Sequence, residues 1–98
     1  MKPYSNVQIR KLKGLAQQRD ALLTMGKEGL SPAFLRTVED ALALHELVKI
    51  RFSAHKEEKD ALAAEMAEKT GAFLVTRLGH TAVLYRPAAE LGKRKIAV

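Results

Sequence analysis

Apolar and polar positions recur along this 98-residue chain with two different periods, and each period predicts a kind of element. Three segments have apolar residues three and four positions apart, which predicts amphipathic helices: residues 6–18, 32–44 and 56–69. Four short segments alternate or are continuously apolar, which predicts strands: residues 21–25, 47–52, 73–78 and 81–86. The first of these strands is expected to be buried, because residues 21–25 are almost entirely apolar.

Residues that favour helix ends and turns mark the boundaries of these elements. Ser5, followed three residues later by Gln8, predicts a capping box at the start of the first helix. The pair Ser31-Pro32 predicts an N-cap and a first helical position. Gly71 is placed as a C-cap of the third helix, and Gly79-His80 predicts a hairpin between the last two strands.

The order α-β-α-β-α-β-β indicates an α/β (α+β) fold. Strands that alternate with helices predict a crossover and parallel pairing, and the final hairpin adds an antiparallel pair. We therefore expect one domain with a four-stranded mixed sheet and helices packed against it, over residues 1–87. Residues 88–98 have no periodicity and are expected to form a mobile basic tail.

The alternation in residues 47–52 distinguishes the two faces of the sheet. Lys49 and Arg51 lie on one face and three apolar residues lie on the other, which predicts one packed face and one cationic face. If the hairpin loop contains only two residues, Arg77 and Arg86 share a face, and we expect them to extend the cationic one. A solvated sheet face normally carries both signs of charge, so a purely basic face favours binding of a ligand.

Composition supports an anionic partner. The chain has 17 Lys and Arg against 11 Asp and Glu, a net charge of +6, which favours RNA, DNA or another polyanion. It has no cysteine, which excludes disulfides, a thiol nucleophile and a cysteine-based zinc site. No stretch approaches the ~20 apolar residues of a membrane span, and the start lacks an apolar signal core. We expect a cytoplasmic protein with no membrane partner.

A glycine turn precedes the second helix. Gly26-Lys27-Glu28-Gly29 has glycine at both ends, which allows positive φ and close approach of a ligand. The helix that starts at Ser31-Pro32 directs its unpaired N–H groups and positive dipole end toward this turn. Such a turn suits a phosphate or a nucleic-acid backbone, although an ordinary β-to-α turn explains the same four residues.

Catalytic patterns are missing. The three histidines, His45, His55 and His80, lie in different junctions without a partner at helix-face spacing, so we expect no metal site. No phosphate-binding loop of the Walker type and no buried carboxylate pair stands out, so we expect neither catalysis nor a cofactor. Aromatic residues are few, which favours contacts to a structured nucleic-acid backbone over base stacking.

Four landmarks, in order, are similar to a known family: residues 12–16, 25–31, 45–50, and 70–72 with 77–87. Together they resemble the CRM domain (chloroplast RNA splicing and ribosome maturation) in its single-domain bacterial, YhbY-like form. The resemblance covers nearly the whole chain, from about Ile9 to Pro87. It implies a fold like the C-terminal domain of bacterial translation initiation factor three, and RNA binding through the glycine loop and a neighbouring basic surface.

On this resemblance we expect a non-catalytic RNA-binding protein that docks structured ribosomal RNA and assists assembly of the large (50S) ribosomal subunit. We expect the protein to be a monomer, although the sequence does not fix its oligomeric state. Its partner would be large-subunit ribosomal RNA or a pre-50S particle. The expected RNA-contacting residues are Gly26, Lys27, Glu28, Gly29, Lys49, Arg51, Arg77 and Arg86, with Arg10 and Lys13 at the margin.

Three other functions stay open at this point. The chain could be a protein-interaction module that regulates ribosomes or translation factors, with its basic face solvated. It could be an enzyme that uses the glycine turn to hold a phosphorylated small molecule, or a protein that binds duplex DNA through charge alone. The sequence leaves open which RNA element is bound and at which stage of assembly.

Overall fold

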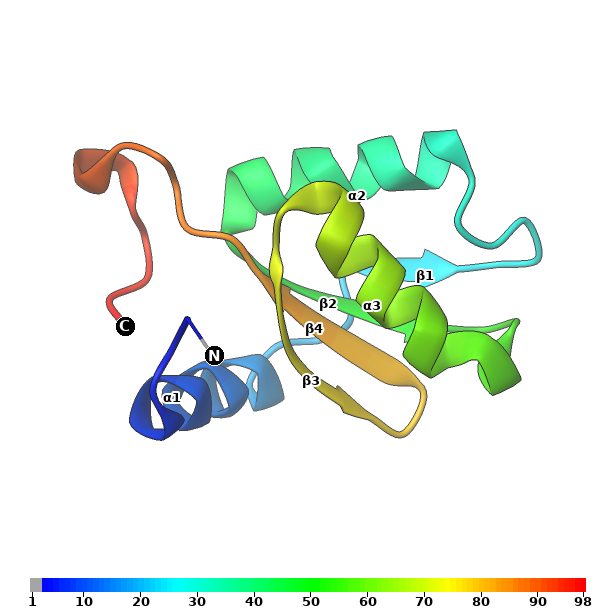
Figure 1. Ribbon diagram of the computed structural model, residues 1–98, viewed down its shortest axis with the longest axis horizontal. Helices are drawn as coiled ribbons and strands as arrows, with labels where there is room; N and C mark the ends of the chain where they lie inside the picture. Colours follow the sequence, from blue (N-terminus) through cyan, green and yellow to red (C-terminus); the bar gives the residue numbers. More distant parts are fainter. Residues whose placement is uncertain (1–2) are drawn as a thin grey trace.

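Three α-helices and four strands follow one another in the computed structural model, which describes residues 3–98 (Figure 1). The helices and strands are α1 (Asn6–Gln17), β1 (Leu23–Met25), α2 (Pro32–His45), β2 (Leu47–Phe52), α3 (Lys59–Thr70), β3 (Phe73–Leu78) and β4 (Thr81–Tyr85). Two 3₁₀ turns, η1 (Lys56–Glu58) and η2 (Leu91–Lys93), complete the chain. The predicted order of elements is confirmed, except that the predicted start of the third helix is the separate turn η1.

The helix ends form where the sequence predicts them. The backbone N–H of Gln8 donates to the Ser5 hydroxyl oxygen at 3.2 Å, and the Ser5 N–H donates to the Gln8 side chain at 2.8 Å. At the start of α2, the Ser31 hydroxyl oxygen accepts from the Phe34 N–H at 3.1 Å. Gly71 ends α3 in the left-handed region, with φ of 66°. These caps are confirmed as the physical reason for the helix boundaries.

The sheet is mixed and has the strand order β1-β2-β4-β3. β1 runs parallel to β2, while β4 is antiparallel to both β2 and β3. Leu78 pairs with Thr81, so the β3–β4 hairpin has the two-residue loop that the sequence predicts. β1 is a short edge strand in which only Met25 is buried, so the expectation of a buried strand is wrong for most of it.

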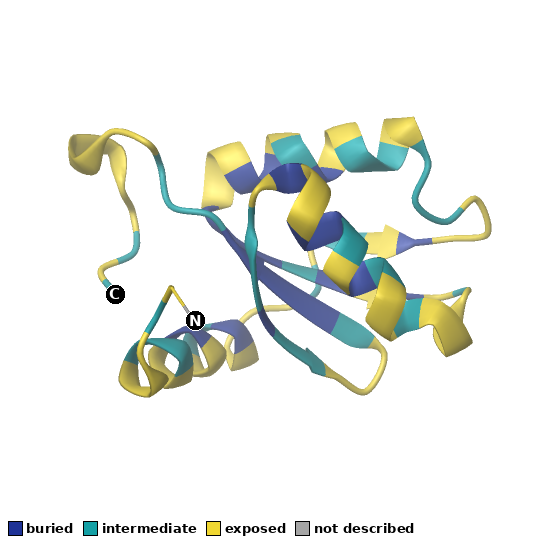
Figure 2. Ribbon diagram, in the orientation of Figure 1, coloured by how far each residue is buried: buried dark blue, intermediate teal, exposed yellow. Residues whose placement is uncertain are grey.

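Helices cover both faces of the sheet, which differs from the single packed face that the sequence predicts (Figure 2). α2 and α3 pack on one face, the α2–α3 face, around Val48, Ile50 and Phe52. α1 packs on the other, the α1 face, where it buries Leu47 and Tyr85 with its own apolar residues. The reason is the apolar stripe of α1, which also has to leave water. α1 covers only the half of its face near the start of β2, and the other half stays accessible.

Residues 88–98 fold back onto the domain in the structure, and the mobility of this segment stays a prediction. The buried carboxylate of Glu46 accepts hydrogen bonds from the backbone N–H groups of Ala88, Lys95 and Ile96. The side chain of Ile96 packs against the α1-side core, and Gln8 donates to the Val98 carbonyl oxygen at 3.4 Å. A buried carboxylate without these donors would be strongly unfavourable, so the three hydrogen bonds favour the folded-back position of the segment.

Candidate nucleic-acid interface

The glycine loop (residues 26–29) leaves β1 as a tight turn. The Gly29 N–H donates to the Gly26 carbonyl oxygen at 3.0 Å, and Gly29 has φ of 64°, a conformation that favours glycine. Gly26 does not have positive φ, so the expectation of positive φ at both glycines holds only for Gly29. A Cβ atom at Gly26 would meet no atom within 4 Å, so this position is open to a ligand.

His55, in the turn after β2, holds the glycine loop in place. Its Nε2 atom lies 2.6 Å from the carbonyl oxygen of Lys27, and its ring is 3.4 Å from the place where a Gly29 Cβ would stand. The Ser53 N–H and hydroxyl both donate to the Met25 carbonyl oxygen at 3.0 Å. The sequence does not reveal this role, because it depends on a left-handed backbone at His55, with φ of 55°.

A shallow hollow of about 350 Å³ lies between the glycine loop and the start of α2. Gly26, Glu28, Gly29 and Ser31 line it together with the first turns of the helix. Pro32 has no N–H, and the N–H groups of Phe34 and Leu35 donate to Ser31. The Ala33 N–H and the helix dipole therefore supply the positive potential here. Glu28 is the unfavourable member for a phosphate, and its exposed carboxylate forms no ion pair within residues 3–98.

Lys49 and Arg51 both lie on the α1 face, as the alternation predicts: Arg51 on its open half, and Lys49 at the border with α1. Arg51 is exposed and pairs with Thr24 of β1, two residues before the glycine loop. The Lys49 ammonium donates to the Arg19 carbonyl oxygen at 3.4 Å, and the Arg19 guanidinium donates to the Leu47 carbonyl oxygen at 3.2 Å. None of these three cations has a carboxylate within 4.0 Å in the part of the chain that the structure describes. They are free to attract an anion.

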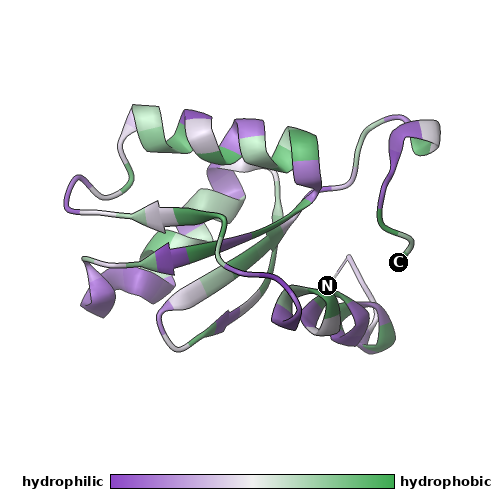
Figure 3. Cartoon of the chain, turned by 180° about the vertical axis from the view of Figure 1, so that it is seen from behind, coloured by the Kyte–Doolittle hydropathy of each residue, from purple (hydrophilic) through white to green (hydrophobic). Residues whose placement is uncertain are grey.

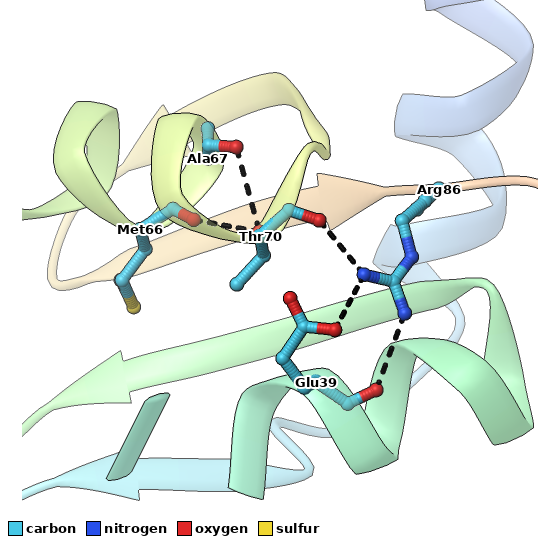
Figure 4. Close-up of polar contacts among 5 residues, drawn as sticks. All are labelled: Glu39, Met66, Ala67, Thr70 and Arg86. Atoms are coloured by element: carbon cyan, nitrogen blue, oxygen red, sulfur yellow. Dashed lines mark hydrogen bonds and ion pairs between the residues drawn. The ribbon is translucent and has the colours of Figure 1, made fainter. Parts of the chain in front are cut away.

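Arg77 and Arg86 share one face, but it is the α2–α3 face, so the prediction that they extend the cationic face is wrong. Arg86 donates to the Glu39 carboxylate and to the Thr70 carbonyl oxygen, both at 2.7 Å (Figure 4). Arg77 forms an ion pair with Asp60 of α3. The reason is register, because Lys49 and Arg51 pair with Val83 and Thr81, whereas Arg77 pairs with Ala82. Side chains on neighbouring residues of a strand point to opposite faces.

The cations predicted on the first helix lie beside the same open half. Lys13 and Lys49 line a groove of about 190 Å³ between α1 and the sheet, whose floor includes Val83. Arg10 is exposed one turn earlier on α1. The structure therefore brings Lys13 together with Lys49 and leaves Arg10 at the edge.

Further cations gather at the end of the sheet that carries the glycine loop. The Phe52 N–H donates to the His80 carbonyl oxygen at 2.7 Å, so the β3–β4 hairpin lies beside the end of β2. The Lys59 ammonium is 3.3 Å from His80 Nδ1, and its charge, with burial and then the charges of Lys56 and Arg77, lowers the pKa of His80. The sequence does not single out Lys56 and Lys59 as candidate binding residues, because the neighbouring Glu57, Glu58 and Asp60 give this segment a mixed charge.

Two further properties concern the described residues as a whole. Within residues 3–98, no three histidine, aspartate or glutamate side chains come together in a way that could hold a metal ion. Among the described helices, none is long and apolar enough to cross a membrane. Hydrophilic residues dominate the glycine loop and the connection from α1 to β1, as the view from behind shows (Figure 3). The glycine loop and its neighbours present backbone N–H groups and cations that form no ion pair within residues 3–98.

Comparison with known proteins gives a consistent result. The family model of the CRS1/YhbY (CRM) domain matches residues 5–86. A Haemophilus influenzae protein named RNA-binding protein is 36% identical over 91 residues, which is 92% of each chain. The Bacillus subtilis protein named Probable RNA-binding protein YqeI is 27% identical over 84 residues, covering 85% of this chain and 88% of the relative.

A solved structure has the same fold. It is the solution structure of the hypothetical protein SAV1595 from Staphylococcus aureus, described as a candidate RNA-binding protein. The two structures superpose with a TM-score of 0.76 at 28% sequence identity, and the match covers 95% of this chain and 98% of the other. The single-domain fold with a four-stranded mixed sheet is thereby confirmed.

Proposed function

Because the chain belongs to the CRS1/YhbY (CRM) domain family, we propose that it is a non-catalytic RNA-binding protein that docks structured ribosomal RNA and assists large-subunit assembly. Relatives that match most of the chain are named RNA-binding proteins, which supports RNA as the partner. Ribosomal RNA as the specific target rests on the family's single-domain bacterial form.

One observation carries the proposal: the glycine loop, tethered by His55, lies at the same sheet end as the unpaired Arg51. An open turn at Gly26 allows an RNA backbone to approach, and Arg51 and Lys27 neutralise phosphates beside it. The start of α2 adds the Ala33 N–H and the positive end of the helix dipole on the other side of the loop. Lys49 continues the charge along the α1 face.

This arrangement favours a structured backbone over single unstacked bases. The Tyr4 ring contacts the Phe73 ring in a tilted geometry and the Tyr85 ring edge-on, in the core beneath α1. Phe52 and Tyr85 are buried, and Tyr4, Phe73 and Phe34 are only partly exposed, so the described part of the chain offers little ring surface on which bases could stack. Binding through phosphates leaves sequence selectivity to the shape of the folded RNA.

Fractionation of a native cell lysate on a sucrose gradient tests the proposal directly. We expect the protein to co-migrate with large-subunit precursors, to be absent from mature ribosomes, and to be released by a moderate salt wash. Migration only at the top of the gradient would overturn the ribosomal target. A pull-down of translation factors that survives nuclease treatment would favour a protein-interaction module instead.

A titration with purified large-subunit ribosomal RNA tests the electrostatic mechanism. If about six phosphates are neutralised, log K falls with log salt concentration at a slope of about −4 to −5. A slope near zero would contradict phosphate contacts. Competition with duplex DNA of the same length separates recognition of RNA shape from attraction by charge alone.

A further inference from the structure

A second hollow, of about 320 Å³, lies at the other end of the α1 face from the glycine loop. It surrounds the start of β2, at Leu47, whereas the glycine loop lies beside the end of β2, where Phe52 pairs with Met25. Five steps along a strand of ~3.3 Å each separate the two ends by roughly 17 Å. The walls come from the end of α1, the start of β2 and the C-terminal segment 88–98.

Three cations converge on this hollow: Arg19, Lys49 and Lys95. Each is held by a backbone carbonyl rather than by a carboxylate. Arg19 donates to Leu47 at 3.2 Å, Lys49 donates to the carbonyl of Arg19 at 3.4 Å, and Lys95 donates to Leu44 at 2.6 Å. A carbonyl positions a cationic group without neutralising its charge.

Within the described part of the chain, none of the three cations forms an ion pair. Asp20 also lines the hollow, but its carboxylate lies more than 4.0 Å from each of these cations. Guanidinium and ammonium groups gathered in a concavity without a partner suit an oxyanion such as phosphate. His45, exposed at the end of α2, lies on the rim and can add a further donor.

Lys95 reaches the hollow because Glu46 fixes the C-terminal segment. The Glu46 Oε1 atom accepts from the N–H of Lys95 at 2.6 Å and of Ile96 at 3.0 Å, and Oε2 accepts from Ala88 at 2.6 Å. The Glu46 side chain is buried, with 2% of its surface exposed. One carboxylate therefore binds both ends of the segment and sets the position of the Lys95 side chain.

We propose that Arg19, Lys49 and Lys95 form a phosphate-binding pocket, which the segment clamped by Glu46 completes, and that RNA supplies the phosphate. The inference rests on the proposed function, because it adds a second contact to the same RNA. Lys95 lies beyond residue 86, where the family match ends, so this contact is additional to the matched domain. A gap of roughly 17 Å between the pocket and the glycine loop requires a polymer, since a mononucleotide cannot reach both.

Two variants that each remove one positive charge test the pocket. Lys95→Gln removes the pocket cation, and Lys93→Gln removes an exposed neighbour that pairs with Glu90 at 3.7 Å. In titrations with purified large-subunit ribosomal RNA, we expect Lys95→Gln to weaken binding about fivefold to tenfold and to reduce the salt slope by about 1. The RNA affinity of Lys93→Gln should stay within about twofold of that of the unchanged protein. Equal effects of the two variants would overturn the pocket.

Glu46→Gln tests the role of the clamp, because the clamp and diffuse charge attraction predict opposite changes in RNA affinity for this variant. It removes a negative charge, so diffuse attraction alone predicts tighter RNA binding. The clamp predicts weaker binding by a similar factor to Lys95→Gln, because an amide nitrogen cannot accept from the segment's N–H groups. Tighter binding by a folded Glu46→Gln protein would overturn the role of the segment. If Glu46→Gln does not fold, the comparison of Lys95→Gln with Lys93→Gln decides whether the pocket contacts RNA.

Inorganic phosphate distinguishes the possible sources of the phosphate. In the unchanged protein we expect millimolar phosphate to shift the NMR signals of Arg19, Lys49 and Lys95, and this response to disappear in Lys95→Gln. If the protein binds no RNA, the proposed function fails, and a phosphate response would then assign the pocket to a free phosphate ligand and overturn RNA as its source. Absence of any response, with RNA binding unchanged in Lys95→Gln, would overturn the pocket and leave the proposed function intact.

Discussion

The Nε2 atom of His55 lies 2.6 Å from the carbonyl oxygen of Lys27, 28 positions earlier in the chain. Because a carbonyl oxygen can only accept, Nε2 carries the proton in this hydrogen bond. The bond joins the turn after β2 to the glycine loop after β1, which are the ends of two parallel strands. The loop is therefore positioned before any ligand arrives, which reduces the entropy lost on binding.

Replacing His55 should weaken RNA binding without unfolding the domain. His55→Asn tolerates the left-handed backbone at this position but cannot reach the Lys27 carbonyl. We expect amide exchange at Gly29 to accelerate and RNA affinity to fall severalfold, while the unfolding free energy drops by about 1 kcal/mol. Hydrogen exchange and an RNA titration measure the two effects. His80→Asn, in the exposed hairpin, serves as the control, and equal loss of affinity in both variants would contradict the tether.

The two glycines of the loop should respond differently to substitution. Gly26→Glu adds a charge at an open position without positive φ, so we expect stability within about 0.5 kcal/mol of the unchanged protein and markedly weaker RNA binding. Gly29→Ala forces a Cβ into the left-handed region and should cost about 1–2 kcal/mol in urea unfolding.

Gly92→Glu is the matched control for charge, because a Cβ there also meets nothing within 4 Å and φ is not positive. If Gly92→Glu lowers RNA affinity as much as Gly26→Glu, the loss reflects net charge and the glycine loop is not the contact.

The two faces of the sheet predict unequal effects for two arginines. Arg51→Gln removes an unpaired cation on the α1 face and should reduce the salt slope of RNA binding by about 0.7 to 0.9. Arg77→Gln removes the same charge, but from an ion pair with Asp60 on the other face, and should change affinity by less than about twofold. Salt-dependent titrations of both variants decide, and a larger effect of Arg77→Gln would place the RNA on the α2–α3 face.

Arg86 should matter for folding rather than for binding. It bonds to Glu39 on α2 and to the carbonyl oxygen of Thr70 at the end of α3, so it connects two helices to the strand end. The ion pair is partly exposed, with 27% and 42% of the two side chains accessible, which screens it. We expect Arg86→Met to lower the unfolding free energy by about 1–2 kcal/mol in urea titrations. Arg36→Met, an exposed change on α2, should stay within about 0.5 kcal/mol.

Low pH should destabilise the fold through protonation of Glu46. Burial alone would raise the pKa of Glu46, but the N–H bonds from Ala88, Lys95 and Ile96, with the Arg94 charge, hold it below the ordinary value of 4.5. A carboxyl group with a depressed pKa stabilises the fold above its unfolded pKa and loses this effect as the pH falls through the folded value. We therefore expect the unfolding free energy to decrease below about pH 5.

In Glu46→Gln the unfolding free energy should depend less steeply on pH below about pH 5. Glu90→Gln, on the exposed part of the same segment, should keep the pH dependence of the unchanged protein. Urea unfolding at a series of pH values measures this. An unchanged acid dependence in Glu46→Gln would assign the titration to other carboxylates.

Much of the fold follows from local rules, because periodicity and caps act within a few residues. Ser5, Ser31 and Gly71 set helix ends through bonds to their own neighbours, which the sequence displays directly. The placement of α1 on the second face was not predictable in this way, since the alternation in β2 describes only which side chains share a face. Leu47, buried under α1, is on the same face as Lys49.

The candidate site was predictable only in part for the same reason. The glycine loop is a local motif, and Lys49 and Arg51 follow from alternation. The position of Arg77 and Arg86 on the α2–α3 face depends on how β4 pairs with β2 and β3, which is a long-range property of the sheet. His55 and Lys95 reach their positions through a left-handed backbone and through Glu46, and neither leaves a periodic signal in the sequence.

The short edge strand β1 has a consequence for how the molecule folds. The β3–β4 hairpin closes over a two-residue turn, whereas β1 can join β2 only after all of α2 has formed the crossover between them. Closing the longer loop costs more chain entropy and brings only a three-residue strand in return. We therefore expect β1 to dock last during folding and to be absent from the rate-limiting transition state. The loop proposed to meet RNA would then be the last part of the newly made protein to mature.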